Sequence, residues 1–304
     1  RDVYKRQLGN HRTRETMSRE SNQALFEATD AQDLAGVKKA LAEGADVNAK
    51  QLKAIHASAL AKAIDAGSLE IVDALLEAGA SVHDLSQGRS LLFWTSQASD
   101  NQPALLERLL DKGLDPLATF LNQGYLTVEL NGWLRESRKW EEASLESPTL
   151  WAKLAQSLME HGLTDPDRSE ASSLLLMDLV SGAFSYEKTT TPNADRRLME
   201  ALDAEAGVAL WNAPLGRGYQ WEGWTLMLLA ANHESLQAVE WFLDHGADLS
   251  LLTPEDQTDE GYPSGNKSLV SVLEGREAYD DEEKLRKALI QRIRSPQRSS
   301  PRLG

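Results

Sequence analysis

Four segments of this sequence share one ending, and the spacing of these endings constrains the fold more than any other feature. Each has an apolar stretch, a glycine and a short turn, and the glycines are Gly44, Gly79, Gly113 and Gly246. The first three glycines lie 35 and 34 residues apart. A repeat of about 34 residues is the length of one antiparallel helix pair. The sequence therefore predicts an all-α chain of stacked helix pairs.

An apolar stripe precedes each glycine, as a helix that packs on one side requires. In the second copy Ile71, Val72 and Leu75 recur at helical intervals, while Glu70 and Glu77 fall on the other face. A glycine at the end of such a helix can take the left-handed conformation. An Asp or Ser two residues later can bind its own backbone and start the next turn.

The segment before Gly246 carries a more specific pattern. Residues 223–231 read Gly-Trp-Thr-Leu-Met-Leu-Leu-Ala-Ala, and residues 58–67 keep the same spacing in the second copy. This pattern resembles the G-x-T-P-L-H-x-A-A signature of the ankyrin-repeat family. The resemblance implies an ankyrin-type solenoid of about six or seven repeats, counting degenerate ones, with projecting hairpin loops and a C-terminal cap helix.

The middle of the chain departs from the period. Residues 150–163 repeat the helix-then-glycine ending, but Gly162 lies 49 residues after Gly113. This spacing predicts an insertion of about fifteen residues, which we expect within residues 131–148. A fifth helix pair is expected from residues 172–183 and 193–211.

These patterns predict five segments along the chain. Residues 1–7 look like a translated sequencing adapter, so we treat residues 1–16 as a non-native leader. The predicted segments are the leader 1–16, three ankyrin repeats in 17–118, degenerate helical repeats with an insertion in 119–221, a repeat with C-terminal capping helices in 222–294, and a disordered tail in 295–304.

Composition narrows the classes of function. The chain has no cysteine, which excludes disulfides and thiolate metal sites from this sequence. Its formal net charge of −15 opposes binding to nucleic acid and favours a protein partner with a basic surface. No apolar run approaches the roughly 20 residues that cross a bilayer. We expect a monomeric protein of the bacterial cytoplasm.

No group of residues predicts catalysis, a cofactor or a metal. The six histidines are dispersed, and His161 and His245 each precede a repeat-ending glycine, where they can meet helix carbonyls. Acidic pairs are too abundant to indicate general acid–base chemistry. Neither a G-x-S-x-G elbow nor a P-loop occurs.

The ankyrin resemblance implies a concave surface lined by variable positions of the hairpins and first helices. Carried onto this sequence, it indicates Trp94 and Trp224 as exposed aromatic anchors, and alanine at both would abolish partner binding while leaving the melting temperature almost unchanged. The alternative is that tryptophans fill the core, as we expect for Trp151 and Trp211. The candidate partner-binding residues are Glu27, Lys62, Arg89, Trp94, Tyr219, Trp221, Trp224 and Leu229.

Three functions remain open from the sequence. The first is a non-catalytic interaction scaffold, for example an immunity or regulatory protein that binds a basic protein. The second is an ankyrin-type effector that is secreted into another cell. The third is an enzyme with its catalytic site in residues 119–221.

Overall fold

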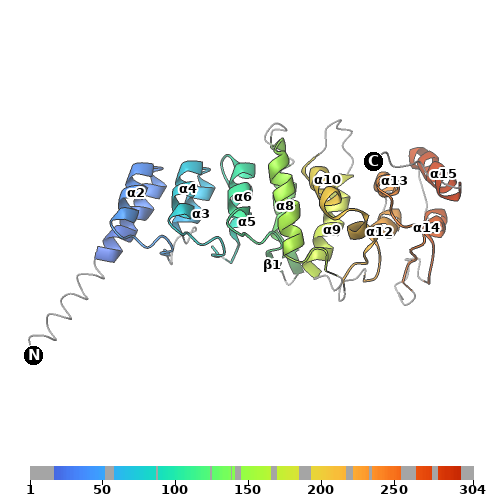
Figure 1. Ribbon diagram of the computed structural model, residues 1–304, viewed down its shortest axis with the longest axis horizontal. Coiled ribbons are helices and arrows are strands. Elements are labelled where there is room, and N and C mark those ends of the chain that lie inside the picture. Colours follow the sequence, from blue (N-terminus) through green and yellow to red (C-terminus); the bar gives the residue numbers. More distant parts are fainter. Residues whose placement is uncertain are drawn as a thin grey trace, which may run out of the picture. The chain divides into compact units, whose positions relative to one another are not determined.

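The chain forms two compact units, residues 1–161 and 162–304, and each is described by itself (Figure 1). The computed structural model describes residues 17–51, 58–86, 88–123, 125–137, 139–140, 145–165, 170–184, 193–216, 222–232, 235–254, 265–275 and 280–295.

The first unit consists of helix pairs and one β-hairpin. A helix over residues 17–30 precedes the labelled elements. These are α2 (Leu34–Ala42), α3 (Ala59–Asp65), α4 (Leu69–Glu77), α5 (Leu91–Gln97), α6 (Gln102–Leu110), β1 (Thr119–Asn122), β2 (Tyr125–Val128), α7 (Glu129–Ser137) and α8 (Pro148–Glu160).

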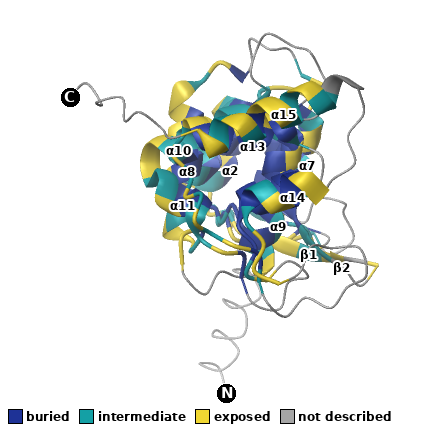
Figure 2. Ribbon diagram, turned by 90° about the vertical axis from the view of Figure 1, so that its right-hand side faces the viewer, coloured by how far each residue is buried: buried dark blue, intermediate teal, exposed yellow. Residues whose placement is uncertain are grey.

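The helices of the first unit pack in two rows. One row contains α3, α5 and α7, and the other contains α2, α4, α6 and α8, with each helix against the next in its row. Apolar side chains such as Leu60, Ile71 and Leu105 fill the space between the rows and are fully buried. Exposed residues lie on the outer faces of the helices (Figure 2). Each pair therefore buries the apolar face of its neighbour.

Local signals fix where these helices begin and end. The Ser58 and Ser147 hydroxyls accept hydrogen bonds from the third backbone N–H that follows each of them. Gly44, Gly79, Gly113 and Gly162 all have φ between 84° and 91°, the left-handed conformation expected where the helix stops. The Asp46 and Asp115 carboxylates accept from the N–H two residues later, as expected for the following turn.

Polar side chains tie each repeat to the next. The Asn48 amide bonds to the backbone of Gly79 and Ser81 in the following repeat. Lys153 on α8 lies 2.6 Å from the Asp111 carboxylate, and this hydrogen bond raises the pKa of Lys153. Contacts of this kind fix the register of neighbouring repeats.

The β-hairpin corrects the expectation that residues 119–221 are purely helical. Strands β1 and β2 pair antiparallel with Thr119 opposite Val128 and Asn122 opposite Tyr125. Two residues separate the strands in the sequence, and the first of them, Gln123, has a φ of 51°. Thr, Phe, Tyr and Val residues on both sides of a Gln-Gly pair are typical of a β-hairpin, a pattern that the prediction of helices did not use.

The segment from Gly113 to Gly162 is longer than one repeat, and its extra residues are spread over three places. The loop before α7 is enlarged by the hairpin, and the connection from α7 to α8 spans residues 138–147. Helix α8 has 13 residues, whereas α6 has nine. Only part of the insertion therefore lies within residues 131–148.

The second unit is also built from helix pairs. Its elements are α9 (Glu170–Ala183), α10 (Ala194–Ala206), α11 (Val208–Asn212), α12 (Leu226–Asn232), α13 (Leu236–Asp244), α14 (Leu269–Gly275) and α15 (Asp280–Arg294).

Helix α9 packs against α10 where the fifth pair was predicted, although Gly207 divides the predicted second helix into α10 and α11, and α12 packs against α13. Trp211 on α11 is buried and meets Trp241 edge to face with ring centroids 5.4 Å apart. Helix α15 covers α13 and α14 and buries Leu289. The protein is thus mostly helical with paired helices, as the sequence predicts.

Candidate binding surface

We call two of the loops that connect one helix pair to the next in the first unit fingers, namely residues 80–90 and residues 114–128. In the 80–90 finger Ser86 and Arg89 exchange two backbone hydrogen bonds of 2.9 and 3.1 Å, which close a tight turn. The 114–128 finger contains β1 and β2. In both fingers the last paired residues, Ser86 with Arg89 and Asn122 with Tyr125, are separated by two residues of sequence.

The two tips have nearly the same sequence. Residues 85–88 read Leu-Ser-Gln-Gly and residues 121–124 read Leu-Asn-Gln-Gly. Leu85 is 57% exposed and Leu121 is 73% exposed. We call these two residues the fingertip leucines. They occupy the same position of adjacent fingers.

Exposed large apolar side chains concentrate on such loops. Among the described residues they are Met17, Leu85, Leu121 and Leu252. Leu252 belongs to the loop after α13 and is 45% exposed. Single exposed leucines are ordinary, but their restriction to interhelical loops, apart from Met17, is a pattern that a binding surface explains.

Arg89 joins the two fingers. Its guanidinium lies over the Phe93 ring of α5, 3.8 Å from the centroid, and over the Phe120 ring of β1 at 3.5 Å. Its Nε donates to the Glu129 carboxylate at 2.8 Å. The guanidinium is thus held between two aromatic rings with its orientation fixed, and part of its side chain stays exposed.

Glu129 explains why Arg89 is held so firmly. Its side chain is buried at the start of α7 and also accepts from the backbone N–H of Ser90 at 3.1 Å and from the Ser90 hydroxyl. A buried carboxylate needs such partners, because desolvation penalises its charge. We call Leu85, Arg89, Phe93, Phe120 and Leu121 together the finger patch.

Three of the residues chosen from the sequence are buried, which corrects their role as exposed anchors. Trp94 is 7% exposed and Trp224 is fully buried, and Leu229 on α12 is buried as well. Helices α5 and α12 turn Trp94 and Leu229 toward the core, and Trp224 is buried just before α12 begins. Tyr219 and Trp221 lie outside the described residues. Trp151 and Trp211 are in the core, as predicted.

Glu27 lies on the helix of residues 17–30 and Lys62 lies on α3, and the two side chains differ in how accessible they are to a partner. Glu27 is exposed and accepts a hydrogen bond from Gln23. The Lys62 ammonium is 2.6 Å from the Asp30 carboxylate, and its side chain is mostly buried. Lys62 therefore serves chiefly to tie two repeats together. Arg89 is the predicted residue that belongs to the finger patch.

Four residues of the finger patch were not predicted from the sequence, namely Leu85, Phe93, Phe120 and Leu121. The repeated Leu-x-Gln-Gly at residues 85–88 and 121–124 could have identified the fingertip leucines, because the two copies lie one repeat length apart. Whether a leucine at this position is buried or exposed depends on the neighbouring finger, which the motif does not describe.

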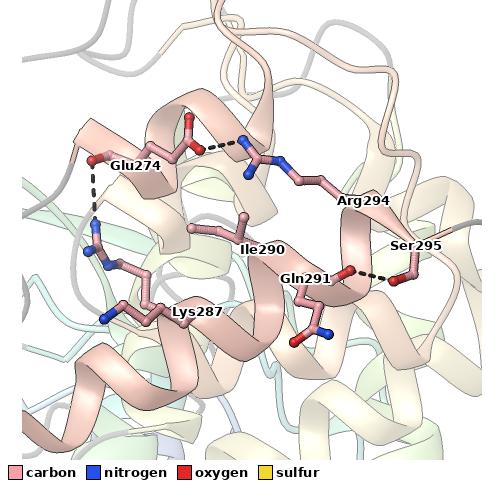
Figure 3. A pocket seen from close by; sticks show the side chains of 7 residues that line it. Glu274, Lys287, Ile290, Gln291, Arg294 and Ser295 are labelled. Atoms are coloured by element: carbon pink, nitrogen blue, oxygen red, sulfur yellow. Dashed lines mark hydrogen bonds and ion pairs between the residues drawn. The ribbon is translucent and has the colours of Figure 1, made fainter.

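We also searched the rest of the described structure for metal sites, hollows and membrane-spanning helices. The described residues contain no group of three His, Asp or Glu side chains arranged to hold a metal ion. A hollow lies between α14 and α15 (Figure 3). Its Arg294 pairs with Glu274, and its Arg286 donates to the Leu273 and Glu274 carbonyls, so these cations cap α14. In the described part no helix is long and apolar enough to span a bilayer.

The two histidines before glycines behave as expected. The Nδ1 atoms of His161 and His245 each lie 2.7 Å from the carbonyl oxygen four residues earlier, at the ends of α8 and α13. They cap the last turns of these helices.

Part of the chain is similar to known proteins. A family model described as ankyrin repeat matches residues 222–251, which contain α12, α13 and Gly246. No curated protein sequence matches the chain.

Among solved structures, the human ASB11 ankyrin repeat domain is 18% identical, with a TM-score of 0.42, and the match covers 88% of this chain and 96% of that one. A second match is the structure of the Bd0816 predatory endopeptidase from Bdellovibrio bacteriovorus in complex with immunity protein Bd3460. It is 16% identical, with a TM-score of 0.32, and covers 88% of this chain and 97% of that one. Residues 222–251 therefore match an ankyrin repeat, and the described helices that end at Gly44, Gly79 and Gly113 close with glycines in the same left-handed conformation as Gly246.

Proposed function

We propose that this protein is a non-catalytic scaffold that binds another protein through the finger patch. The observation that supports this most is the exposure of Leu85 and Leu121 at equivalent positions of adjacent fingers. Burying one exposed leucine at an interface contributes roughly 1.5–3 kcal/mol. Two such leucines can therefore change affinity by about two orders of magnitude or more.

The Arg89 contacts support the same surface. Arginine and aromatic side chains dominate the energy of many protein interfaces. Because Phe93, Phe120 and Glu129 already hold the Arg89 side chain, binding would immobilise little that is mobile in the free protein. The entropy lost on association is reduced accordingly.

The charge of the chain supports a basic partner. The formal net charge is −15, and acidic side chains such as Glu27, Glu70 and Glu77 are exposed on the helices of the first unit. Long-range attraction to a basic surface speeds association and weakens as salt is added. An inhibitory role, in which the scaffold covers a basic protein as an immunity or regulatory protein would, fits these properties.

The test compares three forms of the full chain as affinity baits in a lysate of cells that express it. These are the wild type, a Leu85→Ser/Leu121→Ser variant, and a control with Ala24→Ser/Gln156→Ser, which changes two exposed uncharged positions on helices outside the fingers. We expect at least one protein that the wild type and the control retain and that the fingertip variant retains at least tenfold less, measured by quantitative mass spectrometry.

Circular dichroism melting confirms that all three baits are folded. Identical sets of retained proteins for all three baits would remove the finger patch as the binding surface. An acidic rather than basic retained protein would refute the charge argument alone.

A further inference from the structure

Hydrogen-bonded and non-hydrogen-bonded residue pairs alternate along the β-hairpin, and this alternation determines which backbone N–H and C=O groups of β1 point away from β2. The Glu129 N–H donates to the Ala118 carbonyl at 2.9 Å, so this pair belongs to the ladder. Antiparallel pairs alternate between bonded and non-bonded, and the two-residue turn makes Asn122 and Tyr125 a bonded pair. Phe120 and Thr127 are then bonded as well. The N–H and C=O groups of Thr119 and Leu121 consequently point away from β2.

These outward groups are available. In the described part of the chain no hydrogen bond reaches the backbone of Thr119 or Leu121 from outside the hairpin. Both residues are exposed, whereas on β2 Leu126 is half-buried and Val128 is buried. The edge of β1 is therefore the open edge of this small sheet.

The adjacent finger does not cover that edge. Arg89 stacks over the ring of Phe120, so the 80–90 finger meets a face of the hairpin. The side chain of Leu121 projects from the opposite face because successive strand residues alternate. An added strand would find free backbone groups and an exposed leucine beside each other.

The β1 edge also lacks the features by which proteins usually prevent strand addition. Charged residues and prolines on an edge strand oppose pairing with another chain. Residues 117–128 contain no charged residue and no proline. A neutral, apolar strand fits this edge without an unpaired charge, and basic residues outside the paired segment would meet the acidic remainder of the chain.

We propose that the edge of β1 receives an extended segment of the partner protein, which pairs with the backbone of Thr119 and Leu121 and places an apolar side chain against Leu121. This mode of binding is strand addition to a sheet edge. It rests on the proposed function and specifies how the finger patch holds its partner. Alternating N–H and C=O groups select a polypeptide strand, because its backbone offers the complementary groups at the same spacing.

The experiment selects random 12-residue peptides displayed on phage against the full chain and compares baits that separate backbone from side chain. Leu121→Ala removes the side chain and keeps the N–H. Leu121→Pro also removes the outward N–H, which the ladder does not use. Leu126→Pro is the matched control, since it removes an outward N–H from the other edge. We expect selected peptides with apolar residues at alternate positions that bind Leu121→Pro at least tenfold more weakly than Leu121→Ala and bind Leu126→Pro well.

Hydrogen exchange provides a second readout that does not depend on a variant folding. With a selected synthetic peptide bound to the wild-type chain, the amide hydrogens of Thr119 and Leu121 should exchange at least tenfold more slowly. Those of Phe120 and Thr127, already in the ladder, should change little.

The outcomes separate this proposal from the proposed function. Peptides that bind Leu121→Pro as well as Leu121→Ala, or that leave Thr119 and Leu121 unprotected, would overturn strand addition while the finger patch stands. Selection that yields no peptide with a preference for wild type over Leu121→Pro would overturn it too. Retention of all partners by the Leu85→Ser/Leu121→Ser bait would instead remove the patch itself.

Discussion

Individual residues in this protein are placed by backbone constraints as much as by side-chain chemistry. The turn between the two helices of a repeat requires a left-handed residue, and three repeats meet this need with Gln32, Gly67 and Asn101, whose φ angles are 53°, 70° and 62°. Glycine adopts this conformation freely, asparagine tolerates it and glutamine is strained. The first repeat therefore contains an avoidable strain.

Replacing Gln32 with glycine should stabilise the protein by about 0.5–1 kcal/mol, because the left-handed strain is removed while the exposed side chain makes no essential contact. Urea unfolding followed by circular dichroism measures this change. The reverse test is Gly67→Ala, whose Cβ would lie 2.9 Å from the Asp100 carbonyl oxygen and should destabilise. A Gln32→Gly protein that is less stable than wild type would show that φ strain is not the governing factor.

Trp224 illustrates how burial changes the meaning of a residue. It was expected to be exposed, so that alanine would leave the melting temperature unchanged, but it is fully buried. Trp224→Ala should lower the free energy of unfolding by about 3–5 kcal/mol, because it leaves a large cavity. Trp224→Phe should lower it less. A melting temperature for Trp224→Ala within a degree of wild type would contradict the buried position.

At the scale of elements, the fingers depend on groups that come from several helices. Glu129 begins α7, Ser90 is the N-cap of α5 and Arg89 pairs with Ser86 in the 80–90 finger, so one buried carboxylate links the two helices and the finger. Such a link holds the finger patch in one arrangement. Its strength can be separated from that of the individual residues by a double-mutant cycle.

Glu129→Gln should reduce the free energy of unfolding by about 1–3 kcal/mol, since the amide accepts fewer charge-assisted bonds from Arg89 and Ser90. Arg89→Met should also destabilise, and the double variant should be less destabilised than the two single losses added together. Chemical denaturation of the four proteins gives the coupling. Additive losses would mean that Arg89 and Glu129 do not support each other.

At the scale of the whole molecule, acidic residues dominate the response to pH. The pKa of Asp248 is lowered by the hydrogen bonds it accepts from Ser250, and the pKa of Glu283 is lowered by Lys287 and Arg286. A lowered folded-state pKa contributes stability that is fully present above the unfolded value and is lost as pH falls through the folded value. The unfolded values are near 4.

We therefore expect the melting temperature to change little between pH 7 and pH 5 and to fall below about pH 4. Asp248→Asn keeps an oxygen acceptor for the Ser250 N–H but loses the charge. Its deficit relative to wild type should be present at pH 7 and should shrink as pH falls below 4, measured by scanning calorimetry. A deficit that grows on acidification would have the wrong sign for a lowered pKa.

Much of the repeat architecture follows from the sequence alone. The helix endings at Gly44, Gly79, Gly113 and Gly246, the extra ending at Gly162, the pairing of α9 with α10 and the capping position of α15 follow from local signals, because glycine conformation and apolar periodicity act within one or two turns of chain. These signals are strong enough to predict a repeat of helix pairs from this one sequence.

Tertiary structure decided which side of each helix faces the core and what the loops do. Trp94 and Trp224 are buried because neighbouring helices cover them, and Leu121 is exposed because, in the described part of the chain, its side chain at the tip of the hairpin is left mostly uncovered. Arg89 gains its place from Phe120 and Glu129, which lie more than thirty residues away in the sequence. Burial is set by contacts between repeats, and a local pattern contains no information about which neighbour is present.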